Sequence, residues 1–185
     1  MNVFYVELES LEIVFGLIYN FYSKGETTPT YTFETLGMDK LSGVLVGVRE
    51  DTYYPSVFDK AAYLLLQINT GHFFSNGNKR LALVTTKIFL GINKIRLKTD
   101  IWGKKQLNEM SKIEYKKLLE ILFPKFVNFE DQENFTSADF GYYNISIIIA
   151  DYHKYVEDFD SLKIKTRYFL EKTTKDWDIV FNDEK

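Results

Sequence analysis

One nine-residue segment, residues 72–80, contains most of the side chains in this sequence that could do chemistry together. It begins with His72, passes through Gly77 and ends in two adjacent cations. The next residues, 81–90, are apolar with the period of a helix. A glycine-containing loop that presents N–H groups and cations at the first turn of a helix can hold phosphate. An imidazole at the mouth of that loop could take a proton from a group that attacks the phosphate.

The two cations, Lys79 and Arg80, stand where the dipole of the expected helix favours anions. Each such mismatch costs about 0.3–1 kcal/mol, so two of them indicate a bound anion that offsets the cost. A histidine after a helix is more often a surface or capping residue, and only its neighbours favour a function for His72. The other histidine, His153, has no such neighbours and is predicted to be exposed on a helix.

Length and composition restrict the fold and the partners. The chain has 185 residues, of which 45% are hydrophobic and 17% aromatic, enough to bury a full core in one domain with an extension. The net charge of −3 favours neither nucleic acid nor an anionic membrane as partner. The absence of cysteine excludes disulfides and cysteine-ligated metals. No membrane span and no secretory signal are recognised, which favours the cytoplasm.

Apolar periodicity and helix-capping residues predict a mainly α fold. Helices are expected over residues 10–24 with Gly25 after the end, from Pro55 and Ser56 to about 70, and over 78–93, 107–123, 142–158 and 161–172. Residues 26–40 are expected to be a loop or broken helix, and residues 128–140 an acidic linker.

Two short segments are predicted to be extended. Residues 43–48 are rich in valine and bounded by glycines, and residues 95–98 alternate between apolar and basic. We expect residues 1–125 to form one domain and residues 126–185 a helical extension.

The motif His72-x-Phe74-x-Asn76-Gly77-Asn78-Lys79-Arg80 resembles the signature of the Fic/Doc family. That signature has an acidic residue at the position of Asn76. Lys79, together with the following Leu81-Ala82-Leu83, is more similar to the Doc (death-on-curing) branch. Sequences of the Fic type place glycine before the arginine and a second arginine three residues later, where this chain has Leu83. The resemblance extends over about residues 8–123.

The resemblance implies a Fic/Doc-type helical bundle that binds ATP and transfers part of it to a Ser, Thr or Tyr hydroxyl of a protein target. Doc-type members transfer phosphate and act as toxins that a partner antitoxin neutralises, whereas Fic-type members usually transfer AMP. His72 would be the general base, since a neutral imidazole accepts a proton at pH 7. Gly77 and Asn78 would present backbone N–H groups to the phosphates. Lys79 and Arg80 would neutralise the transferring group, and Phe74 would anchor the loop in the core.

Asn76 departs from the pattern. Family members use Asp or Glu there to hold Mg²⁺, whereas an Asn oxygen is a weak ligand without charge. A slower enzyme, an altered chemistry, an engineered substitution and an inactive nucleotide-binding or protein-interaction module all remain open. A nuclease is disfavoured, because the sequence shows no cluster of further metal ligands.

Two further family features are weakly represented. Residues 43–47 could form the hairpin flap that aligns the target by edge pairing, with Arg49 beside it as a minor candidate for a phosphate contact. Residues 30–35 come nearest to the family's self-inhibitory Ser/Thr-x-x-x-Glu-Gly/Asn motif, but the last position is wrong. Control by a separate antitoxin is therefore the expectation.

Overall fold

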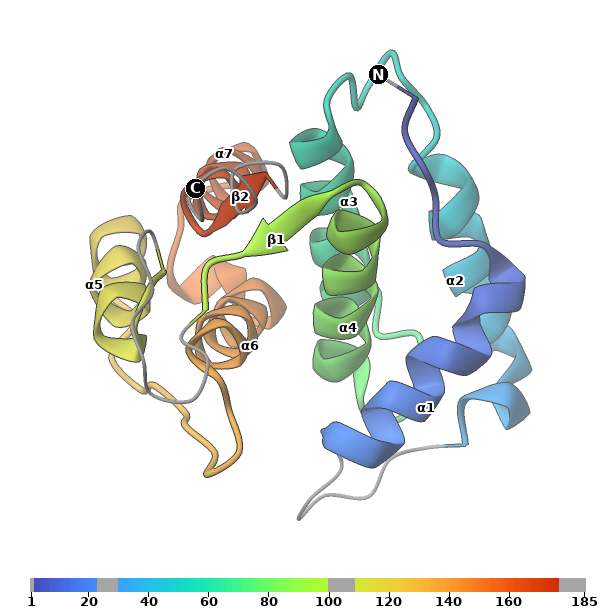
Figure 1. The fold of residues 1–185 in the computed structure, drawn as a ribbon, viewed down its shortest axis with the longest axis horizontal. Helices are drawn as coiled ribbons and strands as arrows, with labels where there is room; N and C mark the ends of the chain where they lie inside the picture. Colours follow the sequence, from blue (N-terminus) through green and yellow to red (C-terminus); the bar gives the residue numbers. More distant parts are fainter. Residues whose placement is uncertain (1, 23–29, 100–108, 177–185) are drawn as a thin grey trace, which may run out of the picture. The chain divides into compact units, whose positions relative to one another are not determined.

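The computed structural model describes residues 2–22, 30–99 and 109–176 (Figure 1). Contacts divide the chain into two compact units, residues 1–93 (unit 1) and residues 94–185 (unit 2). Both units are mainly helical, as predicted. None of the helices in the described ranges combines the length and apolarity that crossing a membrane requires. The expected helix end at Gly25 lies outside the described residues.

Unit 1 is built around two helices, one before and one after the loop that begins at His72. Its elements are the 3₁₀ turn η1 (Leu8–Ser10), α1 (Leu11–Phe21), the 3₁₀ turn η2 (Tyr31–Phe33), α2 (Thr35–Gly47), α3 (Val57–Thr70) and α4 (Asn78–Ile92). The helices α3 and α4 pack against each other, α1 packs on α4, and α2 packs on α3 and on η2 (Figure 1). The predicted helices over 10–24, from Pro55 and Ser56 to about 70, and over 78–93 are found as α1, α3 and α4. Residues 23–24 of the first lie outside the described residues.

The helix α3 is buried on nearly its whole circumference, as the sequence predicts. Ser56 caps its first turn by accepting the Asp59 N–H, and the Asp59 side chain accepts the Ser56 N–H in return. The fully buried Lys60 is neutralised by Asp51 at 2.7 Å and donates to the Val48 carbonyl at 3.0 Å. This pairing lets a charged residue lie in the core.

The prediction of an extended segment at residues 43–48 is wrong, since these residues lie in α2 or directly after it. The buried residues Leu41, Val44, Leu45 and Val48 recur with the helical period, while Val46 is 66% exposed. Within six residues, valines at every second position resemble a strand; the period of 3.6 becomes visible only when Leu41 is included. Tertiary packing on α3 decides the outcome, and the predicted hairpin flap is not present at residues 43–47.

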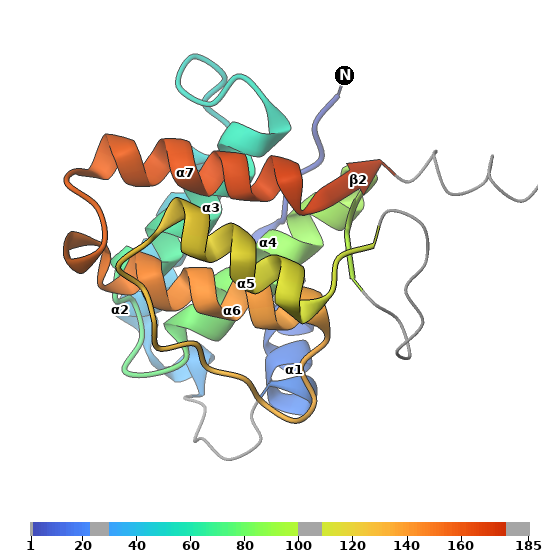
Figure 2. The ribbon, with the colours of Figure 1, turned by 90° about the vertical axis from the view of Figure 1, so that its left-hand side faces the viewer.

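Within its described residues, unit 2 contains three α-helices and a small sheet. Its elements are β1 (Ile95–Leu97), α5 (Lys112–Leu122), α6 (Ser137–Ala150), the 3₁₀ turn η3 (Tyr152–Lys154), α7 (Phe159–Lys172) and β2 (Thr174–Asp176). Figure 2 shows α5 in front of α6 and below α7. The helix α5 packs against both. The contacts of α5 thus group it with α6 and α7 in unit 2. The predicted domain boundary after residue 125 stays a prediction about function.

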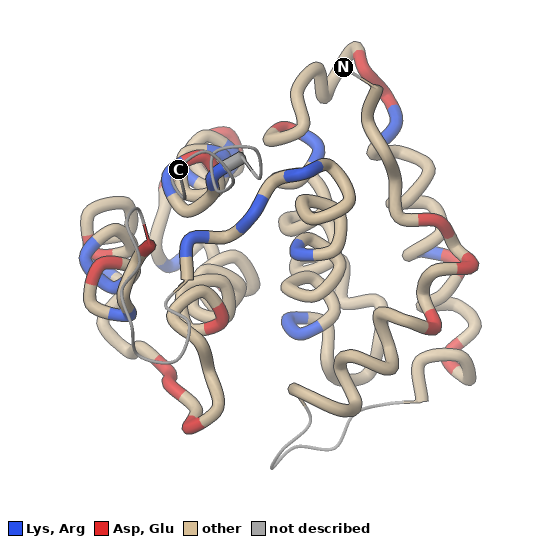
Figure 3. Tube along the Cα trace, viewed as in Figure 1, with Lys and Arg blue, Asp and Glu red and all other residues tan. Residues whose placement is uncertain are grey.

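The strands β1 and β2 pair antiparallel, with Ile95 opposite Asp176 and Leu97 opposite Thr174. The extended segment at residues 95–98 was predicted, whereas no strand was predicted after residue 172. The carboxylate of Glu109, whose side chain is 1% exposed, pairs with Arg96 and Lys175. Figure 3 shows basic residues in succession along the chain on and beside β1.

Two helices of unit 2 start at capping boxes. Ser111 and Glu114 cap α5, and Thr136 and Asp139 cap α6. The expected helix over 107–123 therefore begins at Lys112, and residues 107–108 lie outside the described residues. The expected linker over 128–140 ends early, because Asp139 serves as the acid of a capping box.

Candidate functional site

His72 stands at the end of α3, one residue after Gly71, and its side chain is exposed. Its backbone lies in the left-handed region, with φ 44°. This conformation is uncommon for a residue with a Cβ and costs about 1–3 kcal/mol, so surrounding structure must hold it. Strain of this kind is concentrated at functional sites. Of the two non-glycine residues with positive φ in the described ranges, His72 and Lys94, the first is the residue that the motif assigns to proton transfer.

The loop after His72 is closed by the side chain of Asn78. Its Oδ1 accepts the Phe74 N–H at 3.0 Å, and its Nδ2 donates to the Phe74 carbonyl at 2.7 Å. The Phe74 ring is buried, with its edge against the Tyr31 ring at 4.9 Å between centroids. The predicted anchoring by Phe74 matches this burial. Asn78 was assigned only a backbone role, and its side chain adds a second role as the closure of the loop.

Gly77 is the residue before α4 and has φ 78°, a conformation that glycine adopts without steric cost. The backbone geometry therefore favours glycine at this position. However, the Gly77 N–H donates to the Asn76 side-chain oxygen at 2.6 Å. The N–H that was expected to meet phosphate is thus engaged within the loop.

The start of α4 differs from the starts of α3, α5 and α6. Those three begin with capping boxes whose acidic residue stands in the first turn, whereas α4 has neither a side-chain cap nor an acid there. Its first turn instead carries Lys79, which is half-buried, and Arg80, which is 5% exposed. Figure 3 shows basic residues at this end of α4 and further along it. An anion would complement both the dipole and the two cations.

Arg80 is held against the end of α1. Its Nη1 donates to the Tyr22 carbonyl at 3.1 Å, and the Tyr22 hydroxyl accepts from Lys87 at 2.9 Å. Burial raises the pKa of Tyr31, and the nearby positive charge of Arg80 acts in the opposite direction. The guanidinium therefore lies in an aromatic, largely buried environment, where its interaction with an anion is stronger than in water.

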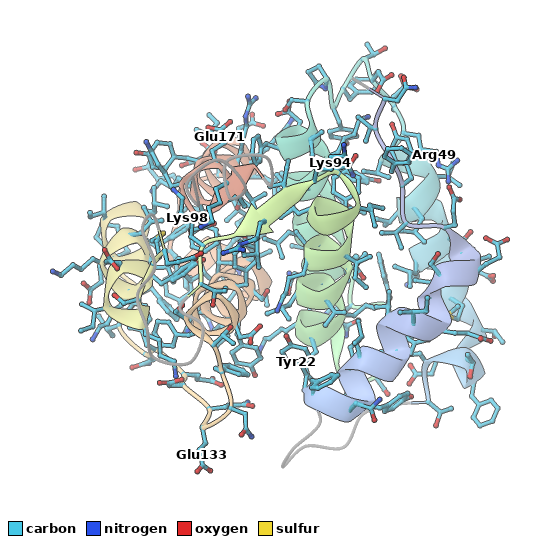
Figure 4. All side chains as sticks on the ribbon, in the orientation of Figure 1. Tyr22, Arg49, Lys94, Lys98, Glu133 and Glu171 are labelled. Carbon is cyan, nitrogen blue, oxygen red and sulfur yellow. The ribbon has the colours of Figure 1, made fainter. Side chains whose placement is uncertain are left out.

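Arg49 lies elsewhere in unit 1. It pairs with Glu7 and stacks over the Tyr5 ring at 5.1 Å. Figure 4 shows it far from Tyr22, the residue that holds Arg80. The structure thus places Arg49 away from the loop.

Two residues that the motif did not include bind the loop from the segment before α2. The Tyr31 hydroxyl donates to the Gly77 carbonyl at 3.3 Å, and the Glu34 carboxylate accepts from Ser75. The first contact joins residues that are 46 positions apart in the sequence, and the second joins residues that are 41 positions apart. Periodicity carries no signal for such pairs. Only the weak likeness of residues 30–35 to a family motif drew attention to Glu34, and for a different role.

The residues present do not fit a preformed Mg²⁺ site. The Asn76 oxygen already accepts the Gly77 N–H, and no group of three or more His, Cys, Asp and Glu able to hold a metal occurs in the described ranges. Mg²⁺ is usually bound by one or two carboxylates together with substrate phosphates. The chain supplies no carboxylate at this position of the motif.

The model of the Fic/DOC family matches residues 26–90. This stretch contains the whole motif, from His72 to Arg80, together with α2, α3 and most of α4. The match supports the Fic/Doc family for this part of the chain. No curated protein and no solved structure matches the chain.

Proposed function

We propose that this protein is a Doc-like transferase that moves a phosphoryl group, or alternatively AMP, from ATP to a Ser, Thr or Tyr hydroxyl of a protein target. One observation carries the proposal. The exposed, strained His72 stands at the mouth of a braced loop that leads into a helix start with Lys79 and Arg80 but without an acid or a cap. The family match covers the same residues and supports a Fic-type transferase or a related module.

In the proposed reaction, His72 accepts the proton of the target hydroxyl as its oxygen attacks the γ-phosphorus. A new O–P bond forms, and the bond from the γ-phosphorus to the oxygen of the leaving ADP breaks. With AMP transfer, the α-phosphorus is attacked and pyrophosphate leaves. Lys79 and Arg80 stabilise the negative charge that spreads over the transferring oxygens.

The loop residues have distinct tasks in this proposal. Gly77 supplies the left-handed turn that starts α4, and Asn78 keeps the loop closed through both backbone groups of Phe74. The N–H groups of the first turn of α4 receive the phosphates. The general base and the phosphate-binding groups thereby meet at one junction, between α3 and α4.

Phosphate rather than AMP is the preferred group. Lys79 stands where Fic-type sequences have glycine, and Leu83 stands where they have a second arginine. Leu83 is fully buried and can make no contact with a nucleotide. We further propose that the protein is the toxin of a toxin–antitoxin pair and that a separate antitoxin protein controls it.

A second candidate is a catalytically weak relative that binds nucleotide or protein without transfer. The engaged oxygen of Asn76 favours it, because a carboxylate that could hold Mg²⁺ against the phosphates is missing there. The residues do not fit that metal, so no step above depends on it.

The deciding experiment incubates the full chain in lysate with ATP labelled at either the α or the γ position. Label transferred to protein from the γ position is expected. Transfer from the α position alone would instead establish AMP transfer. No transfer from either position, with nucleotide binding retained, would establish the binding module.

A further inference from the structure

The carboxylate of Glu34 binds two groups of one loop residue. It accepts the Ser75 hydroxyl at 2.6 Å and the Ser75 N–H at 2.8 Å. The same pairing of a carboxylate with the N–H and O–H of one residue recurs in the capping boxes Ser56–Asp59, Ser111–Glu114 and Thr136–Asp139. There it spans three residues and fixes a helix start. Between Glu34 and Ser75 it spans 41 residues and fixes a loop onto the start of α2.

The segment that carries Glu34 is itself firmly placed. Tyr31 is 1% exposed, stacks on Phe15 at 4.5 Å between ring centroids and meets the Phe74 ring edge-on. Its hydroxyl donates to the Gly77 carbonyl. Residues 31–34 therefore contact the loop at Phe74, Ser75 and Gly77 from a base anchored in α1.

The position of the carboxylate distinguishes two roles. A glutamate that blocked an anion site would occupy the cations or the N–H groups at the start of α4. Glu34 instead binds Ser75, three residues before Asn78, the first residue of α4. Its carboxylate binds the N–H and hydroxyl of Ser75, and neither of these groups is a proposed phosphate contact. This arrangement is that of a tether.

We propose that Glu34 is a positioning residue, which holds the 72–78 loop in the conformation that binds ATP; this inference rests on the proposed function. Without the tether the loop samples other conformations, and only the competent fraction binds nucleotide. The apparent KM for ATP then rises in inverse proportion to the competent fraction that remains.

The test compares Glu34→Gln with Glu12→Gln in the full chain. Glu12 is an exposed glutamate on α1 in the same unit, so it controls for the loss of one charge. For Glu34→Gln we expect amide hydrogen exchange in residues 72–78 to accelerate roughly tenfold and the KM for ATP to rise roughly three- to tenfold, with kcat and melting temperature little changed. Glu12→Gln should leave exchange in residues 72–78, KM and kcat unchanged, with at most the small loss of stability that follows from removing an acid from the first turn of α1.

Ser75→Ala provides a second, independent variant, since it removes the hydroxyl bond and keeps the N–H bond. Its effect on KM should be smaller, and the double variant should lose less than the product of the two single effects, because the two side chains act on one contact. Independent, fully multiplicative effects would contradict the tether.

Three results would overturn the proposal. Unchanged exchange and KM in Glu34→Gln would show that the contact positions nothing. A higher transfer rate would show that Glu34 blocks the site, and a shifted Mg²⁺ dependence would make it a metal ligand. If the wild-type chain transferred no label but exchange still depended on Glu34, the proposed function would fail while the tether itself stood.

Discussion

At the scale of single residues, His72 has a backbone conformation that lowers stability and a side chain placed for the proposed chemistry. Its left-handed backbone destabilises the fold, and its exposed imidazole stands at the entrance of the loop. Glycine, which has no Cβ, would adopt this backbone conformation at lower energy. We therefore interpret histidine at position 72 as retained for chemistry at the expense of stability.

The first prediction concerns His72→Ala. We expect the rate of label transfer to fall roughly 10²- to 10⁴-fold, as for loss of a general base, with the fold intact. His72→Gly should lose the same activity but be about 1 kcal/mol more stable than His72→Ala in urea unfolding, since glycine adopts the left-handed conformation freely.

The matched control is His153→Ala, which replaces the other histidine, an exposed residue in η3 of unit 2. It should transfer label at the wild-type rate. Activity that survives His72→Ala would remove the assigned base, and a loss with His153→Ala would point to a nonspecific effect.

The second prediction concerns Asn76→Asp. A carboxylate at this position restores the charged ligand that Mg²⁺ prefers, and it can still accept the Gly77 N–H as Asn76 does. We expect Mg²⁺-dependent transfer to increase by at least roughly tenfold, the usual effect of a good metal ligand. The measurement is a Mg²⁺ titration of the γ-label assay for both chains; identical curves would argue against a degenerate metal site.

At the scale of elements, the loop depends on how closely α2 approaches it. Gly37, near the start of α2, is buried, and a Cβ at that position would meet the Phe73 carbonyl oxygen and, at 2.8 Å, the Phe74 ring. Gly43 lies on the same helix, and a Cβ there would meet nothing within 4 Å. One helix thus offers both a sensitive glycine and a matched tolerant one.

The third prediction compares Gly37→Ala with Gly43→Ala. Gly37→Ala should displace the loop and lower stability by about 1–3 kcal/mol, as overpacking does. Gly43→Ala should raise stability by about 0.4–1 kcal/mol, because alanine has the better helix propensity. Urea unfolding and ATP binding measured on both variants test this. Tight ATP binding by Gly37→Ala would show that the loop tolerates displacement.

At the scale of the whole molecule, contacts divide the chain into two compact units. The proposed chemistry uses residues of unit 1 alone, since His72 to Arg80 and the braces Tyr31 and Glu34 all precede residue 94. In unit 2, the buried Glu109 joins β1 to β2 through Arg96 and Lys175.

The fourth prediction concerns Glu109→Gln. Removing this charge leaves Arg96 and Lys175 without their carboxylate, which should lower the stability of unit 2 by about 2–3 kcal/mol. Hydrogen exchange should accelerate within residues 94–176 and stay unchanged in residues 72–78. The control is Glu171→Gln, which breaks only an exposed pair with Arg167 and should cost less than about 0.5 kcal/mol.

An equal acceleration of exchange in both units would show that they unfold as one. That result would show that the full chain unfolds as a single cooperative unit.

The sequence by itself determined the features that depend on local periodicity and local chemistry. Apolar spacing and capping residues placed α1, α3 and α4, and the motif identified the α3–α4 junction as the candidate site. The turn at Gly77 is also a local feature, since a left-handed turn before a helix favours glycine.

Only the tertiary structure decided the rest, because the deciding contacts join residues far apart in the sequence. Packing on α3 made residues 43–47 helical where a six-residue window resembled a strand, and pairing with β1 formed β2 from residues for which no strand was predicted. The braces from Tyr31 and Glu34 to the loop span more than 40 residues. Such pairings arise when separate elements bury a shared surface, and no spacing rule along the chain encodes them.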